Sequence, residues 1–205
     1  MQFKLSLASV ALCLVGGNAL VHPGSSSTSY GINKRQDDCL TAKESQTLAE
    51  DFAWLVASWN VNTTYSEALL NATYAENLHD WSDSIRVMES AGCTNGPEPL
   101  ANSRAEFAVD QATLEPFEFD VLKVWHSCDE VTFLWQHPNS AGHRVRGIVL
   151  LETGWERGAS EGNRGGGDKR LVKTVYSEFN TVSWFTNTGV FTPANCTGHA
   201  PPLQS

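Results

Sequence analysis

The sequence predicts an α+β domain in which helices come first and antiparallel strands follow. Two observations predict the helices: apolar residues recur at helical spacing after residue 41, and capping residues precede two such stretches. A third observation predicts the sheet, because from Phe117 onward the chain has runs rich in Val, Phe, Trp and Thr that alternate with polar residues.

The first predicted helix covers Ala42–Trp59. Thr41 and Glu44 have the spacing of a capping box at its start. The apolar residues that follow at three- and four-residue intervals form one face, which we expect to pack on the sheet: Leu48, Phe52, Leu55 and Trp59.

Two shorter helices are predicted further along. One begins after Ser66, and the other covers Arg104–Thr113, where Ser103 and Glu106 repeat the capping-box spacing. Between them, Tyr74–Met88 mixes polar groups with aromatic residues and has no clear period, so no element is assigned to it.

Phe117–His137 is predicted to form an antiparallel hairpin with its turn at Ser127–Glu130. Lys123 interrupts the first strand, so we expect a bulge or a barrel-like bend there. Alternate positions are expected to share one face: Phe117, Phe119, Val121 and Trp125 on the first strand, and Val131, Phe133 and Trp135 on the second.

Three further strands are predicted at His143–Leu151, Leu171–Phe179 and Thr181–Phe185. Gly154–Arg170 is rich in glycine and is interpreted as a long hairpin loop. A phosphate-binding loop is the alternative, but no Gly-Lys-Ser/Thr motif and no strand-to-helix context support it.

The N-terminal region indicates export. Lys4 precedes the apolar run Leu5–Val15 and small residues follow, so residues 1–19 are predicted to be a secretory signal peptide. The dibasic pair Lys34 and Arg35 predicts a pro-segment over residues 20–35, removed by a kexin-type protease, although the pair is also readable as incidental. The folded domain is expected over residues 36–192, followed by an irregular tail over 193–205.

Four cysteines lie beyond the predicted signal peptide: Cys39, Cys93, Cys128 and Cys196. In an oxidising compartment they favour two disulfides, for which three connectivities are open. Their spacings match no Cys-x-x-Cys site, so no metal is expected. Three Asn-x-Ser/Thr sequons predict glycan sites at Asn62, Asn71 and Asn195.

The chain is acidic, with 14 basic and 23 acidic residues and a formal charge of −9. Loss of Lys4, Lys34 and Arg35 with the leader makes the mature chain more acidic still. Such a surface repels nucleic acid and anionic membranes, so neither is expected as a partner. No nucleotide loop or nucleophile elbow occurs, and we expect no cofactor.

Three segments together carry a family resemblance: HDWSDSI at residues 79–85, WHSCDEVTFLW at 125–135 and KTVYSEFNTVSW at 173–184. They resemble the fungal secreted branch of the nuclear-transport-factor-2-like (SnoaL-like) superfamily, over roughly Cys39 to Val190. The resemblance implies a cone-shaped, strongly curved antiparallel sheet wrapped around the N-terminal helices, with an apolar pocket open at one end. Ketosteroid isomerase, scytalone dehydratase and limonene epoxide hydrolase use that pocket for acid–base chemistry, whereas other members only bind or dimerise.

Three residues are candidate catalytic groups: Asp80, His126 and Glu178. In related folds the segment of Asp80 lines the pocket mouth, and a carboxyl group beside an apolar cavity can serve as a base. His126 can move a proton at neutral pH, or else it forms a structural hydrogen bond beside Cys128. Glu178 shares a strand face with Tyr176, and the pair would orient a carbonyl substrate if that face lines the cavity. If the face meets solvent, both residues are exterior.

Five residues are candidate ligand contacts: Trp54, Trp81, Asp83, Trp125 and Tyr176. The tryptophans are included because an indole stacks on a ring-containing ligand, although most of the seven in this chain are expected in the core. Asp83 has an alternative role, in which it caps a short helix or turn together with Ser84.

These features favour a secreted, extracellular domain that binds a small apolar molecule, with a homodimer through the open sheet face as a further association. The first alternative is a cofactor-free acid–base dehydratase, isomerase or cyclase in secondary-metabolite biosynthesis, and the second is a secreted surface-interaction (effector-like) protein. Among the disulfide connectivities we favour Cys39–Cys128 with Cys93–Cys196, because the first pair would join the start of the first helix to the hairpin turn.

Overall fold

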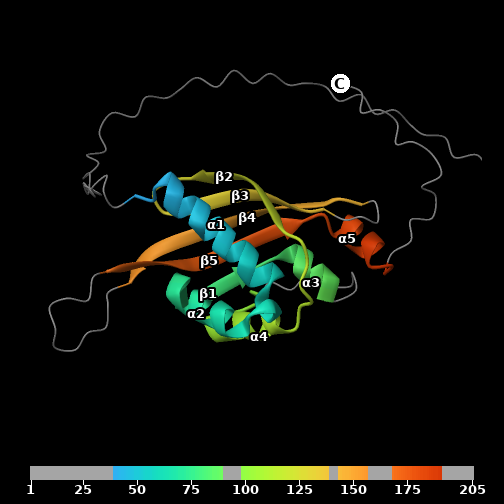
Figure 1. The fold of residues 1–205 in the computed structure, drawn as a ribbon, viewed down its shortest axis with the longest axis horizontal. Coiled ribbons are helices and arrows are strands. Elements are labelled where there is room, and N and C mark those ends of the chain that lie inside the picture. The colour runs from blue at the N-terminus through green and yellow to red at the C-terminus, as the bar shows by residue number, and fades with distance from the viewer. Residues whose placement is uncertain (1–38, 90–97, 139–142, 157–167, 191–205) are drawn as a thin grey trace, which may run out of the picture. The chain divides into compact units, whose positions relative to one another are not determined.

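Five strands form one sheet in the spatial order β1-β5-β4-β3-β2 (Figure 1). The computed structural model describes residues 39–89, 98–138, 143–156 and 168–190, which belong to one structural unit, Lys34–Ser205. The strands are β1 Tyr74–Trp81, β2 Asp120–His126, β3 Glu130–His137, β4 Val145–Glu156 and β5 Lys169–Phe179. Strands β2 to β5 pair antiparallel, whereas β1 runs parallel to β5. The predicted α+β class is confirmed, with the difference that one strand pair is parallel.

The helices cover one face of this sheet. They are α1 Ala42–Ala57, α2 Thr63–Thr73, α3 Asp83–Glu89, α4 Arg104–Ala112 and α5 Thr181–Asn187, with a short 3₁₀ turn, η2, at Trp59–Val61. Helix α1 packs across β2 and β3, α2 and α4 contact β1, and α3 contacts both β5 and α5 (Figure 1). Within the described residues, no helix is long and apolar enough to cross a membrane.

The core lies between the helices and the inner face of the sheet. Val131, Phe133 and Trp135 of β3 are buried there, as the period of two predicts. Phe52 of α1 packs edge-on against Phe133, with the ring centroids 5.5 Å apart. The predicted capping box of α1 is present, which fixes where the helix begins.

A bulge in β2 reverses which face of the sheet each side chain in the second half of the strand points to. The pairing register with β3 shifts between Val121 and Lys123, where the bulge was predicted. Val124 consequently packs against the core, while Trp125 faces outward and is 43% exposed. The expectation that Trp125 shares the inner face is therefore wrong, because one extra residue inverts the alternation.

Two helices differ from the elements expected. Thr181–Phe185, expected as a strand, forms most of α5, because the Asn180 side chain accepts a hydrogen bond from the Ser183 N–H at 3.0 Å and starts a helix. Helix α2 begins several residues earlier than expected, since the Asn62 side chain accepts from the Tyr65 N–H at 3.1 Å. In both places an asparagine cap decides the boundary.

The disulfide Cys39–Cys128 is confirmed and ties the chain before α1 to the turn between β2 and β3. The Leu40 N–H also donates to the Cys128 carbonyl at 3.0 Å, so the backbone is paired at the same point. Several predictions lie outside the described residues: those for the leader, the pro-segment, the tail, Cys93, Cys196 and Asn195. The other two sequons, at Asn62 and Asn71, are exposed.

Candidate functional site

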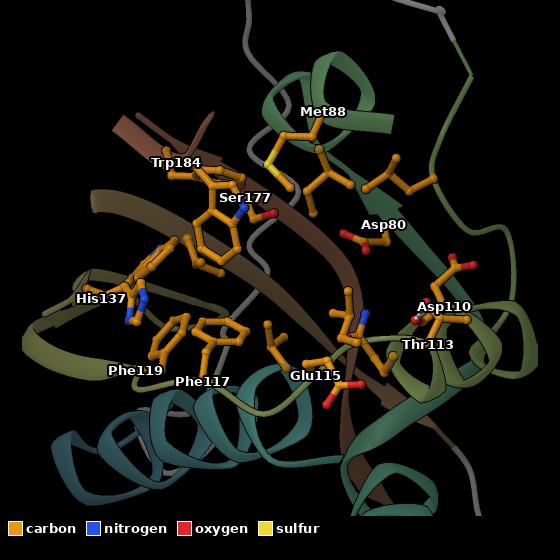
Figure 2. Close-up of a pocket in the computed structure, with 18 of the residues that line it drawn as sticks. Asp80, Met88, Asp110, Thr113, Glu115, Phe117, Phe119, His137, Ser177 and Trp184 are labelled. Carbon is orange, nitrogen blue, oxygen red and sulfur yellow. Dashed lines mark hydrogen bonds between the residues drawn. The ribbon is translucent and has the colours of Figure 1, made fainter. Parts of the chain in front are cut away.

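A cavity of about 420 Å³ lies between the inner face of the sheet and the helices (Figure 2). Its lining residues come from α1, β1, α3, α4, the segment that leads into β2, strands β3 to β5, and α5. Most of these residues are apolar or aromatic. A concave, mainly apolar space of this volume is typical of small-molecule sites.

Aromatic side chains gather at one end of the cavity, as Figure 2 shows for Phe117, Phe119, His137 and Trp184. Phe119 stacks on Trp135 with the ring centroids 4.4 Å apart and 15° between the ring planes. Trp184 of α5 packs edge-on against Phe117 at 5.4 Å. Rings that brace one another in this way form a rigid wall against which a flat apolar ligand can pack.

Gly147 of β4 makes room for the indole of Trp135, its neighbour on β3. A Cβ atom at position 147 would lie 2.6 Å from Trp135 Nε1 and 2.5 Å from the Glu178 carbonyl oxygen. No side chain fits at these distances, so glycine allows the indole to lie close to β4. Trp135 Nε1 is a buried donor without a hydrogen-bond partner among the described residues.

Asp80 of β1 supplies the most deeply buried carboxyl group of the cavity, with the residue only 5% exposed. Its N–H donates to the Ala101 carbonyl at 2.9 Å, and its own carbonyl accepts from the Leu100 N–H at 2.7 Å. This bridge fixes the residue in the wall. Figure 2 shows the carboxyl group pointing into the cavity, and its Oδ1 has no hydrogen-bond partner within the described part of the chain.

The pKa of Asp80 is raised from 3.8 to about 7, chiefly because burial removes water from the charged form. The nearby Asp110 and Glu89 carboxylates contribute to this rise, while a hydrogen bond from the Trp81 backbone opposes it. A carboxyl group with a pKa near neutrality can both accept and return a proton around neutral pH. Asp80 therefore has the protonation behaviour that acid–base chemistry requires.

Unpaired polar atoms concentrate at this cavity. The described residues contain five buried side-chain atoms without a hydrogen-bond partner, and four belong to residues that line it: Asp80 Oδ1, Gln111 Oε1, Trp135 Nε1 and Asn187 Oδ1. Buried polar atoms are nearly always paired, since an unpaired one costs about 1–3 kcal/mol. Four such atoms in the residues of one cavity wall are therefore unusual.

Of the three catalytic candidates, the structure brings only Asp80 into the cavity. His126 is exposed at the end of β2, with its Nδ1 3.4 Å from the Ser127 carbonyl oxygen. Glu178 lies on the outer face, where its carboxylate accepts hydrogen bonds from the N–H groups of Asp83 and Ser84 at 2.8 and 3.0 Å. It thereby caps the first turn of α3, which is a structural role.

Tyr176 does not meet the expectation that it faces the cavity. Successive residues of β5 alternate between the two faces, so Ser177 lines the cavity while Tyr176 and Glu178 point outward. Trp125, turned outward by the bulge, is covered by the Lys123 ammonium group, 5.0 Å from its ring centroid. These side chains belong to the exterior.

The remaining ligand-contact candidates also lie outside the cavity lining. The Trp54 Nε1 donates to the Ser66 hydroxyl at 3.1 Å and joins α1 to α2. Trp81 ends β1 without lining the cavity, and Asp83 begins α3, where its backbone is capped by Glu178. The alternative considered for Asp83 was that it caps a short helix or turn with Ser84. Asp83 does lie at a helix start, but the side chains that accept from the first N–H groups are those of Glu178 and Ser82.

Sequence reasoning missed most of the aromatic wall and the acids near Asp80. The alternation of Phe117 and Phe119 indicated that they share a face, but nothing local indicated that this face lines a cavity. Trp184 was missed because its segment was expected to be a strand. Asp110 and Gln111 on α4 belong to no sequence motif, and only the tertiary fold brings them into the same cavity wall as Asp80.

The described residues contain no group of three or more His, Cys, Asp or Glu side chains arranged to hold a metal ion.

A family model, described as an NTF2-like domain, matches residues 38–191 of this chain. A comparison with curated protein sequences finds no match. Among solved structures, the chain is similar to a candidate ketosteroid isomerase from Kribbella flavida DSM 17836, with 13% identity over 78% of this chain and 91% of that one and a TM-score of 0.43.

Two other solved structures have similar backbones. One is an NTF-2 like protein of unknown function from Silicibacter pomeroyi DSS-3, with 11% identity over 69% of this chain and 100% of that one and a TM-score of 0.37. The other is a de novo designed protein with a curved β-sheet, with 10% identity over 74% and 97% of the two chains and a TM-score of 0.42.

Proposed function

The chain belongs to the NTF2-like family, and on that premise we propose that it binds a small, largely apolar molecule in the cavity of Figure 2. One observation carries the proposal: the residues that line an aromatic-walled cavity of about 420 Å³ include four with buried polar atoms that the described residues leave unpaired. The apolar wall supplies affinity, and the few polar atoms fix the orientation of the ligand. The family is one whose fold commonly holds small hydrophobic ligands.

The test is native mass spectrometry of the protein purified from the organism that makes it, followed by extraction and identification of any bound compound. The Ser177→Leu variant is the informative comparison, because Ser177 is 7% exposed and the larger side chain intrudes into the cavity. Thr174→Leu is the matched control, since Thr174 lies on the same strand and points to the outer face. We expect the wild type and the control to retain the compound and Ser177→Leu to lose it. Equal occupancy in all three proteins would refute the cavity as the site.

A second function, cofactor-free proton transfer, is favoured by Asp80 alone. Its pKa of about 7 and its unpaired Oδ1 in an apolar space suit a general base or acid in an isomerase, dehydratase or cyclase reaction. With a compound identified, turnover by the wild type and its loss in Asp80→Asn would support an enzyme. Tight binding of the compound without turnover would support a binding or carrier protein instead.

Export and origin in a fungal secreted branch of the family remain part of this proposal. The disulfide between Cys39 and Cys128 supports an oxidising compartment. N-terminal sequencing of the secreted protein tests the processing sites, with a start directly after Arg35 as the expected result.

Two further associations stay predictions, a homodimer and a surface-interaction role. Both would use the outer sheet face, where Ile148 is 52% and Tyr176 is 40% exposed. Light scattering of the wild type and of Ile148→Glu tests the dimer, which the added charge should dissociate. A wild type that is monomeric would exclude it.

A further inference from the structure

We propose that the molecule bound in the cavity is a protonated amine on an apolar body, with its ammonium group seated against the Asp80 carboxylate. This inference rests on the proposed ligand-binding function and adds the chemical class of the ligand. It is carried by the charge of the cavity wall, by the unpaired carboxyl oxygen within it and by the separation of its acidic and aromatic ends.

Among the described residues, those that line the cavity include acidic side chains and neither Lys nor Arg. Four lining residues carry a carboxyl group: Asp80, Glu89, Asp110 and Glu115. Arg86 and Arg104 of the adjoining helices do not line the cavity and donate to backbone carbonyls, Arg86 to that of Glu98 and Arg104 to that of Tyr74, both at 2.9 Å. An anionic ligand would meet repulsion from the ionised carboxylates of the wall, whereas a cation would be attracted to them.

The buried Asp80 carboxyl group supplies a specific partner for such a cation. The residue is 5% exposed, and its Oδ1 lacks a hydrogen-bond partner in the described residues. The Gln111 Oε1, a second unpaired acceptor, lines the same cavity. An ammonium group has three donors and no acceptor, so it suits a wall whose unpaired carboxyl and amide oxygens are acceptors better than a hydroxyl group with its single donor.

The two ends of the cavity define the rest of the ligand. Figure 2 shows Asp80 and Asp110 on the opposite side from Phe119 and His137. A molecule that fills the space therefore has its charge at one end and a ring or hydrocarbon body against the stacked aromatic rings at the other. A bare inorganic cation would leave this wall unused, and no metal-binding group occurs among the described residues.

Binding of an amine would release a proton below neutral pH. The groups that face Asp80 are Asp110 of α4 and Glu89 of α3, both acidic, and their repulsion favours its protonated form. A bound ammonium group reverses that balance and holds Asp80 ionised, so the proton leaves to the buffer. The buried Tyr74 hydroxyl stays neutral throughout, because burial raises its pKa well above its usual value.

The test uses three probes with one ring system and different end groups: naphthylmethylamine, naphthylmethanol and naphthoate. Isothermal titration calorimetry of the full mature chain around pH 8 should show the amine binding at least about tenfold tighter than the alcohol, with the carboxylate weakest. Around pH 6, titrations in buffers of different ionisation enthalpy should show release of close to one proton with the amine and none with the alcohol.

Two variants separate binding of the amine at Asp80 from a general attraction of the amine to an acidic protein. Asp80→Asn should reduce amine affinity to that of the alcohol and abolish proton release, while alcohol affinity changes less than about threefold. Glu118→Gln is the control, because Glu118 is exposed between the two lining residues Phe117 and Phe119 and loses the same charge outside the cavity. It should keep the full amine preference.

The outcomes are distinct. If the alcohol binds as well as the amine, or if Asp80→Asn keeps the preference for the amine, the inference is overturned while the ligand-binding function stands. If none of the three probes binds, both are contradicted. Preference for the amine that is lost only in Asp80→Asn establishes the inference.

Discussion

The stability of this protein should depend on pH through one buried side chain, Asp80. Its pKa rises from 3.8 to about 7 on folding, because the ionised carboxylate loses its water inside the cavity. The folded state then holds a proton that the unfolded state has released, so stability falls as pH rises between these two values. At about 1.4 kcal/mol for each pH unit, the loss amounts to roughly 4 kcal/mol.

Asp80→Asn tests this reasoning, because the amide resembles the protonated carboxyl group and does not titrate. Urea unfolding of the wild type and the variant from about pH 4 to about pH 8 gives the free energy of unfolding of each. We expect the free energy of unfolding of the variant to rise relative to that of the wild type by roughly 4 kcal/mol from the low to the high end of this pH range. Most of this relative rise should be complete by about pH 7. The exposed Glu118→Gln variant should give a nearly constant difference. A constant difference for Asp80→Asn as well would refute the claim that the Asp80 carboxyl group is buried with a raised pKa.

Three further changes test the scaffold around the cavity. Cys128→Ser removes the disulfide to Cys39, which closes a loop of 89 residues. The variant should lose about 4 kcal/mol of unfolding free energy in a urea titration, and an unchanged midpoint would mean that the bond is absent. Gly147→Ala places a Cβ atom against the Trp135 indole. It should lower stability in thermal unfolding by about 1–3 kcal/mol and shift the Trp fluorescence. A neutral effect would contradict the close contact between the indole and β4. Glu178→Ala removes the cap of α3 and should cost about 1 kcal/mol with faster amide exchange confined to that helix, so uniform exchange would argue against capping.

Local rules predicted the fold wherever one pattern governs one element. The capping box at Thr41 set the start of α1, and the alternation of Val131, Phe133 and Trp135 identified the buried face of β3. Strand β1 was not foreseen, because Tyr74–Trp81 pairs in parallel with a strand nearly a hundred residues later and takes its conformation from that neighbour. Helix α5 was missed because its Val, Trp and Phe residues favour strands while one asparagine cap starts a helix.

The site was less predictable than the fold, for a geometric reason. A one-residue register difference decides whether a strand side chain faces the cavity or solvent, and the sequence does not fix that register. Tyr176 and Ser177 illustrate the point, since the conspicuous aromatic residue points away and the small serine lines the cavity. Asp80 was found because its surroundings mix acids with aromatic residues, whereas its partner Asp110 comes from a helix with no such signal.

The most direct measurement is a carbon-13 NMR titration of the Asp80 carboxyl group, assigned by its absence from spectra of Asp80→Asn. We expect a titration midpoint about three units above that of an ordinary aspartate, and a shift of that midpoint when naphthylmethylamine binds. A midpoint near the ordinary value that no probe alters would contradict the claim that Asp80 is a buried carboxyl group in the wall of a ligand cavity.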